Sequence, residues 1–453
     1  MIETIRNAWK IPELRKKMLF TVFALLIFRL GSAIPVPYIN GEGLQEYLKM
    51  QSGTILDLMN AMSGSAFAMA TIFALSIQPY INSSIIIQLL TIAIPALERL
   101  ARDGGEEGRK KIASITRYTT VAIALLQGFG YYSLIRSYGL VDNGGLNNVW
   151  VGFVIVLTFT AGSAFLMWLG EQITEFGIGN GISILLFAGI VSRGPGMVTD
   201  MISGVQMWKG VKAGTVTAET YTALGYSAEQ AEAALKQALA PWMIPLIIIG
   251  MLALVVFIVF ISNAERRLPV QYAKRVVGRK MYGGQSTYIP MKINSTGVMP
   301  LIFGFAILQF PATIFAFFPT SGINVWWQGF QSGIWYQIVL AVLIIAFTYF
   351  YTSITFNPVD ISKNMQQNGG IIPGIRQGRA TSDYLSRVSG RLTLFSALFL
   401  AVLATIPTML TRIFGITAPF GASSVLIAVS VGIETIRQVE AQMVMRHHKG
   451  FLG

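Results

Sequence analysis

Long apolar runs separated by polar connections dominate the chain, and they predict ten membrane-spanning helices. About 20 residues at about 1.5 Å rise per residue cover the hydrocarbon core of a bilayer, which is roughly 30 Å thick. The pattern therefore predicts an all-α polytopic membrane protein. The predicted spans are 18–34, 67–94, 115–135, 149–169, 181–201, 243–262, 296–318, 335–356, 392–410 and 420–435.

The stretch 76–95 is long enough to span a bilayer, but it places polar residues where lipid would lie. At about 100° per residue, one side of a helix carries Gln78, Ile81, Ile85 and Gln88. A bare amide in hydrocarbon costs several kcal/mol, so this face is expected to look onto protein or a water-filled cavity. It is a candidate lining for a pathway, and an ordinary helix contact held by amides is the alternative.

Composition restricts the class of protein. Of the 453 residues, 53% are hydrophobic and only 12% are charged, against about 25% charged in soluble proteins, which excludes one large soluble domain. The absence of cysteine excludes disulfides and thiolate metal sites, and the two histidines, His447 and His448, both lie near the C-terminal end. We therefore expect no catalytic site, no cofactor and no metal.

The Lys and Arg residues are distributed unequally between the two sides of the predicted membrane. When residues near span ends are assigned to the nearer side, 26 lie on the side of the N-terminus and 7 on the opposite side, with Arg29 inside the first span. By the positive-inside rule, both termini are cytoplasmic. The basic segment before the first span lacks a clear cleavage site, so that span is expected to be retained.

The ten spans divide the chain into two halves, 1–204 and 241–440, with an outer insertion at 205–240 and a cytoplasmic tail at 441–453. Five spans in each half place the halves in opposite orientation, as in proteins with inverted repeats. The insertion has the composition of a small pair of surface helices.

Three connections have distinct compositions. Segment 35–66 contains a short apolar piece that either re-enters the membrane or lies at the outer surface. Segment 97–111 mixes both charge signs around glycines and predicts a solvated loop, whereas the Gly-rich segment 170–184 predicts a tight turn between two spans.

Two cytoplasmic loops, 263–294 and 357–388, interleave cations with Tyr, Gly and Pro. Such surfaces dock acidic proteins or RNA phosphate through charge-assisted contacts. The alternative is that these cations only set the topology and contact anionic lipids. That alternative explains the sign of the charge but not why two loops of about thirty residues are needed.

Several long motifs resemble the SecY family of protein-conducting channels. They include QPYINSSIIIQLL, FLMWLGEQITEFGIGNGISI, RRLPVQYAKR, FNPVDISKN and GGIIPGIRQGRAT, and they extend across almost all of the chain. The resemblance implies a clamshell of two inverted five-helix halves around an hourglass pore. It also implies translocation of unfolded preproteins across the bacterial plasma membrane and sideways release of apolar segments into the bilayer. The outer insertion is longer than is usual for the family.

The resemblance also assigns roles to individual residues. It implies an apolar pore ring of Ile81, Ile85, Leu186, Ile190, Met299 and Ile406. The plug maps to Asp57, Leu58, Met59, Asn60, Ala61 and Met62, and extends to about Ala66. The lateral gate includes Thr91, Gln127 and Asn294, and the docking surface includes Arg266, Arg267, Lys274, Arg275, Arg376 and Arg379. The implied partners are SecE, SecG, the SecA motor ATPase, the ribosome, signal sequences and unfolded preproteins.

Two other classes of function share some of these features. A secondary transporter for a small solute also uses inverted repeats and broken helices, but it usually carries intramembrane Asp or Glu, and the predicted spans hold almost none away from their ends. A receptor or assembly scaffold without a pore would be distinguished by ion conductance after deletion of the plug.

Overall fold

The computed structural model describes most of the chain. The described residues are 2–50, 60, 63–142, 144–145, 147–215, 217, 238, 240–272, 275–277, 280–282, 286–315, 322–414 and 422–449. The chain divides into two compact units, which we call unit 1 and unit 2. Unit 1 comprises Met1–Met251, Phe305–Tyr336 and Pro407–Gly453, and unit 2 comprises Leu252–Gly304 and Gln337–Ile406.

Each predicted span coincides with a helix over most of its length. In chain order these helices are α2 (Pro12–Gly31), α5 (Gln78–Ala93), α7 (Gly105–Ser137), α8 (Asn148–Phe176), α9 (Gly181–Ser192) continued by α10 (Gly194–Lys212), α13 (Met243–Asn263), α14 (Met299–Phe315), α16 (Ile334–Thr355), α18 (Arg379–Phe414) and α19 (Ala422–Lys449). Among the described residues, five shorter helices connect or precede them: α1 (Ile2–Lys10), α3 (Gly41–Met50), α6 (Pro95–Arg102), α15 (Gly322–Ser332) and α17 (Pro358–Gln367).

Length and hydropathy alone qualify fewer of these helices as spans. Among the described residues, five helical stretches are long and apolar enough to cross a membrane, and the pair α5 and α6, bent by 106°, makes a possible sixth. The other helices at predicted spans do not meet these criteria of length, hydropathy and charge, and two examples show why. Helix α14 has 17 residues, and α2 carries Arg15, Lys16 and Lys17 near its start.

The segment 63–77, which we call the turn segment, is not helical, although the sequence predicted a span beginning at residue 67. Its backbone has positive φ at Ser65, Ala70 and Ser76. The amide of Ile72 donates to the carbonyl of Ile34 at 3.0 Å, so the backbone groups are paired through tertiary contacts rather than a helical ladder. Helix α5 begins only at Gln78, where a proline occupies the first turn.

The connection 97–111 also differs from its prediction. It was expected to be an irregular loop, but α6 and the first turns of α7 cover it, with only residues 103 and 104 between the two helices. Glu106 and Glu107 occupy the first turn of α7, where negative charge interacts favourably with the helix dipole. The Gly-rich segment after α8 is a tight turn between α8 and α9, as predicted.

The core of unit 1 is built around the turn segment, α7 and α8. Phe67 stacks on Tyr131 with ring centroids 4.4 Å apart, and Phe159 of α8 lies 5.0 Å from the same tyrosine. Close approach of α8 to the turn segment requires a glycine. A Cβ on Gly162 would lie 2.0 Å from the carbonyl oxygen of Ile72, so any larger residue would force the two elements apart.

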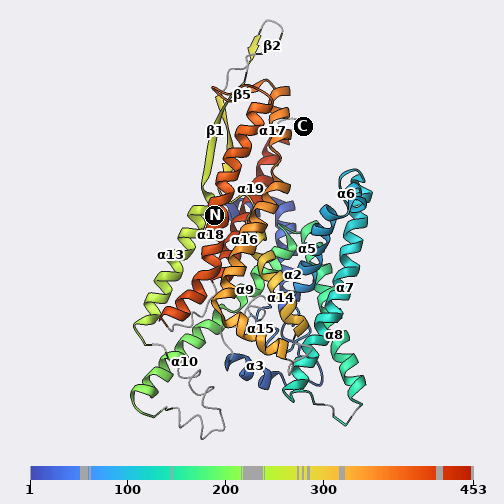
Figure 1. Cartoon of the computed structure of the whole chain (residues 1–453), viewed down its shortest axis with the longest axis vertical. Helices are drawn as coiled ribbons and strands as arrows, with labels where there is room; N and C mark the ends of the chain where they lie inside the picture. Colours follow the sequence, from blue (N-terminus) through green and yellow to red (C-terminus); the bar gives the residue numbers. More distant parts are fainter. Residues whose placement is uncertain are drawn as a thin grey trace. The chain divides into compact units, whose positions relative to one another are not determined.

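Unit 2 contains a small β-sheet that the sequence did not predict. Its three strands are ordered β4 (Ser286–Lys292), β1 (Glu265–Tyr272) and β5 (Gly370–Ile371), and both pairings are antiparallel. A separate two-stranded sheet pairs β2 (Arg275–Val277) with β3 (Lys280–Tyr282). Strand β5 lies beside α17 (Figure 1). The inner face of β1 carries Leu268 and Val270, which pack with Met365, Ile372 and Leu385.

Candidate functional site

The four predicted pore-ring residues of unit 1 are buried apolar side chains on two helices. Ile81 and Ile85 of α5 are 6% and 2% exposed, and Leu186 and Ile190 of α9 are 2% and 4% exposed. Helix α8 contacts both α5 and α9. These branched side chains offer no hydrogen-bonding group, so a constriction built from them holds water and ions poorly.

A side-chain cap marks where α9 begins, and burial changes along the length of α5. Asn180 caps α9, because its Oδ1 accepts from the amides of Ile182 and Ser183 at 3.0 and 3.3 Å. On α5, Gln78 is buried together with Ile81 and Ile85, whereas Gln88 is exposed. The predicted face is therefore enclosed in its first two turns and open to its surroundings in the last.

The remaining two predicted ring residues lie in unit 2 and are half-buried. Met299 is the first residue of α14, and Ile406 lies in the C-terminal part of α18. Both have apolar side chains, of which the methionine is the more flexible.

Of the residues predicted for the plug, Asn60 is described, and Asp57, Leu58, Met59, Ala61 and Met62 lie outside the described residues. Asn60 organises the beginning of the turn segment, because its Oδ1 accepts from the amide of Ala68 at 3.0 Å. Ser63 donates to the carbonyl of Asn60 at 3.1 Å and accepts from the amide of Phe67 at 3.0 Å. The Tyr131 hydroxyl donates to the carbonyl of Phe67.

The turn segment is also held by the cation inside the first span. Arg29 of α2 is exposed, and its Nη1 donates to the carbonyl of Gly64 at 3.3 Å. Gly64 has φ of +67°, and a Cβ there would lie 2.5 Å from Oγ of Ser192 at the end of α9. Gly64 therefore lies where α2, the turn segment and α9 meet. Arg29 lies two residues before the end of α2, so its charged group can extend to water rather than remain in hydrocarbon, where its charge would be costly.

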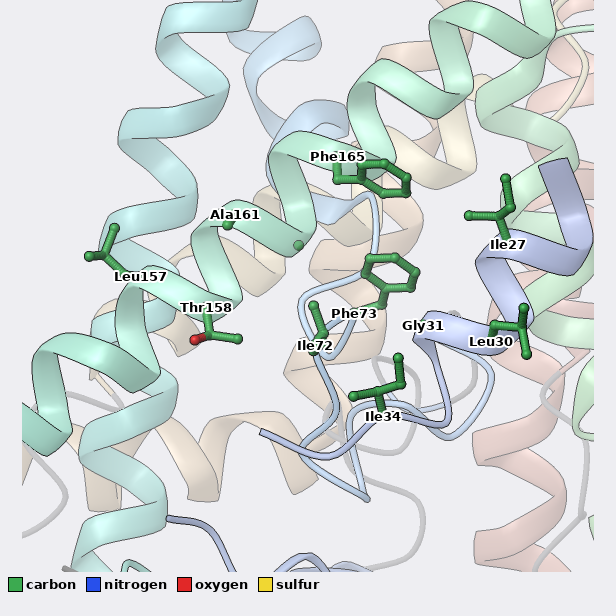
Figure 2. Close-up of a pocket in the computed structure, with 11 residues that line it drawn as sticks. Ile27, Leu30, Gly31, Ile34, Ile72, Phe73, Leu157, Thr158, Ala161 and Phe165 are labelled. Atoms are coloured by element: carbon green, nitrogen blue, oxygen red, sulfur yellow. The ribbon is translucent and has the colours of Figure 1, made fainter. Parts of the chain in front are cut away.

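An apolar cavity of about 720 Å³ lies on a different face of α2. Figure 2 shows the Phe73 ring of the turn segment beside Phe165 of α8, with Ile27 and Leu30 of α2 at the other side. The Phe73 and Phe165 rings are stacked 5.9 Å apart. The hydroxyl of Thr158, which also lines the cavity, already donates to the carbonyl of Val154 at 2.7 Å. The described lining of the cavity is therefore apolar, as in a lipid environment, and offers no binding group for a polar solute.

The three predicted gate residues differ in how their polar groups are used. The Thr91 hydroxyl donates to the carbonyl of Ile87 within α5. Asn294, in unit 2, accepts a hydrogen bond from the Ser396 hydroxyl at 3.2 Å. Gln127 of α7 is 3% exposed, and within the described part of the chain its Oε1 has no partner. Of these three gate residues, Gln127 is the one with an unpaired buried acceptor among the described residues, which is costly at rest.

Sequence reasoning missed two polar features of unit 1. Asn82, next to Ile81, is 4% exposed, and neither amide atom has a partner among the described residues. The sequence could have indicated Asn82, because it is a polar amide residue inside an apolar predicted span. Arg117 of α7 and Glu171 of α8 form a bidentate ion pair at 3.0 and 2.9 Å. No sequence signal joins these two, because they are 54 positions apart.

Pairing of β1 with β5 joins the two predicted basic loops into one structure. Gln271 lies opposite Ile371 and Tyr272 opposite Gly370. We call the exposed cations around this sheet the basic sheet surface, and its described members are Arg266, Arg267, Arg376 and Arg379. Of the other predicted docking residues, Lys274 lies outside the described residues, and only the backbone of Arg275, in β2, is described.

The arginines of the basic sheet surface are not equivalent. Arg267 forms an ion pair with Glu265 at 2.8 Å and lies over the Tyr288 ring, 4.7 Å from its centroid. The hydrogen bond to Glu265, followed by charge interactions with Tyr288 and Glu265, raises the pKa of Arg267. In the described part of the chain, no carboxylate pairs with Arg266, Arg376 or Arg379. These three are therefore the cations most available to an acidic partner.

Comparison with known proteins identifies relatives over the whole chain. The sequence profile of the SecY family matches residues 71–436. The protein translocase subunit SecY of Aquifex aeolicus is 40% identical over 459 residues, and that of Streptomyces griseus is 41% identical over 468 residues, each covering 100% of both chains.

Solved structures show the same fold. One, described as the structure of a protein conducting channel, superposes with a TM-score of 0.63 at 18% identity and covers 97% of each chain. Another is Sec61 in a canine ribosome-channel complex from the endoplasmic reticulum, with a TM-score of 0.60, 18% identity and 97% coverage of each chain.

Proposed function

The chain belongs to the SecY family of protein translocase subunits, and on this basis we propose how it moves unfolded preproteins through a membrane. It is the channel-forming subunit rather than an enzyme. The observation that supports the mechanism best is the burial of Ile81, Ile85, Leu186 and Ile190. The resemblance adds Met299 and Ile406 to these four as the family's pore ring, an apolar constriction that excludes ions at rest and gives a passing polypeptide no fixed hydrogen bonds.

The beginning of the turn segment, residues 63–66, overlaps the end of the predicted plug. The resemblance assigns to residues 57–66 the plug that closes the outer side of the constriction in the family, and Asn60, Ser63 and Arg29 hold the beginning of the turn segment. Opening breaks these contacts, each of which is a single hydrogen bond contributing about 1 kcal/mol, so a signal sequence displaces the plug if it binds the open state more tightly than the resting state by more than the sum of these contributions.

The lateral gate contains Thr91, Gln127 and Asn294. Polar groups across a membrane helix seam contribute only about 0.6 kcal/mol each, so such a seam opens readily. An apolar signal sequence then moves into lipid, gaining about 0.3 to 0.6 kcal/mol per large apolar residue. The unpaired Oε1 of Gln127 supports this assignment, because opening lets water or the signal sequence satisfy it.

The basic sheet surface docks the SecA motor and the ribosome on the cytoplasmic side of the bacterial plasma membrane, where both termini also lie. Exposed Arg266, Arg376 and Arg379 supply charge that meets carboxylates or RNA phosphate. The membrane partners SecE and SecG complete the channel, and anionic lipids contact the cytoplasmic cations.

Ion conductance in planar bilayers tests the constriction. In the reconstituted complex, replacing both Ile81 and Ile85 by Ser should raise the resting conductance, because a wetted constriction conducts. The matched control replaces Ile248 and Ile249 of α13, which are 45% and 64% exposed, by Ser. Equal conductance in the two double variants would remove Ile81 and Ile85 from the seal.

Preprotein transport distinguishes this function from solute transport. Vesicles that contain the complex, supplied with SecA and ATP, should protect a secretory precursor from added protease. A secondary transporter would neither bind the motor nor protect the precursor, and that result would contradict the proposal.

A further inference from the structure

We propose that helix α15 lies in the lipid–water boundary of the outer leaflet, with its exposed apolar face in direct contact with phospholipid. The helix follows α14 in the outer connection 319–334 that the charge distribution predicts, and a single residue separates its end from the start of α16. This inference rests on the proposed orientation in the membrane and goes beyond translocation itself.

The composition of α15 suits a lipid boundary rather than water. Its sequence, GINVWWQGFQS, contains no charged residue. The side chains of Ile323, Val325 and Trp326 are 59%, 64% and 63% exposed. At about 100° per residue these three lie within one half of the helix surface, so they form one face. A contiguous exposed apolar face of this kind marks an interaction surface.

Aromatic contacts anchor α15 to the protein along one edge of this face, where Phe330 also stacks on Trp326 with ring centroids 5.7 Å apart. Trp327, the residue after Trp326, is only 8% exposed. Its ring lies 5.4 Å from that of Phe315 in α14 and 5.2 Å from that of Phe330. Phe330 in turn lies 6.0 Å from Tyr336 in the first turn of α16. These contacts fix the rotation of α15 about its own axis, so the packing of Trp327 and Phe330 keeps Trp326 exposed.

Continuity with a membrane span identifies lipid as the occupant. The exposed face of α15 is followed along the chain by Ile334 and Trp335, which are 53% and 67% exposed at the start of α16. Two exposed tryptophans at one end of a span match the aromatic belt at the headgroup level. Because α15 carries no cation, the contact depends on apolar burial and not on anionic headgroups.

A spin label in a single introduced cysteine tests this placement. The chain has no native cysteine, so Val325→Cys is labelled selectively in the complete complex with its membrane partners. The matched control is Asn147→Cys, an exposed outer position before α8. We expect the label at 325 to be relaxed more strongly by oxygen, which concentrates in lipid, than by a water-soluble nickel chelate, and the label at 147 to show the reverse order.

Each other outcome overturns the proposal. Stronger relaxation by nickel than by oxygen at 325 would place α15 in water. Low accessibility to both reagents would show that a protein partner covers the face. The oxygen preference should also be the same in vesicles of pure phosphatidylcholine and in vesicles with one-third phosphatidylglycerol, and a preference found only with the anionic lipid would contradict a contact based on apolar burial.

Discussion

Replacing Arg29 by Met removes the hydrogen bond that holds the turn segment to α2. The Nη1 of Arg29 donates to the carbonyl of Gly64 at 3.3 Å. A hydrogen bond from a charged donor contributes about 1.5 to 3 kcal/mol. The length of this bond and the exposure of Arg29 to water reduce that contribution to about 1 kcal/mol. At about 1.4 kcal/mol per factor of ten, the resting conformation should lose about fivefold in population relative to the open one.

The assay is the frequency of spontaneous openings in planar bilayers that hold the reconstituted complex. Arg29→Met should open about five times as often as the unmodified channel. Arg136→Met provides the matched control, because Arg136 is also an exposed arginine near the end of a span that is predicted to lie on the outer side, but it belongs to α7. If Arg29→Met and Arg136→Met open equally often, the contact with Gly64 does not stabilise the resting state, and the reasoning is wrong.

Three further substitutions test separate parts of the structure. Gly162→Ala should lower the thermal unfolding midpoint of the complex through overpacking worth about 1 to 3 kcal/mol, whereas Gly250→Ala, with open space around it, should not. Gln127→Leu removes an unpaired buried acceptor, so it should raise that midpoint and slow opening by a signal sequence; an unchanged midpoint would show that Gln127 is satisfied at rest. Arg376→Glu should reduce SecA-driven export of a precursor into vesicles, and Arg136→Glu, predicted to lie on the outer side, should leave it unchanged.

Hydropathy predicted the helices well because each span is a local property of about 20 consecutive residues. The all-α membrane fold is confirmed by the relatives and by the solved structures with which the chain superposes. The tight turn before α9 was also predictable, since Asn180 caps the helix through atoms two and three residues away. Interactions between residues two or three positions apart can be read from any short window of the sequence.

The features that the sequence did not predict depend on residues far apart. The turn segment is apolar enough to resemble a helix, but its amide at Ile72 pairs with Ile34, and its backbone follows the surface of α8. Strand β1 pairs with β5 about 100 residues later, and neither strand alternates strongly enough to be recognised alone. Arg117 and Glu171 are joined only because α7 packs on α8. No local pattern encodes these pairings.

Helical spacing singled out the face with Ile81 and Ile85, and composition singled out the two basic loops, but the resemblance to a family assigned the individual pore-ring, plug, gate and docking residues, and these assignments remain predictions. The structure adds physical detail to some of them. Ile81 and Ile85 are buried as a dry constriction requires. Among the docking residues, Arg267 is occupied by Glu265 and Tyr288, a distinction that depends on the register of β1 and β4.

The sheet in unit 2 has a mechanical consequence. Strand β1 begins two residues after α13 ends, and β5 is followed within eight residues by α18. The backbone ladder between β1 and β5 therefore couples the ends of two spans that are distant along the chain. If a motor or ribosome docks on these loops as proposed, force applied to either loop reaches both α13 and α18 through the paired strands.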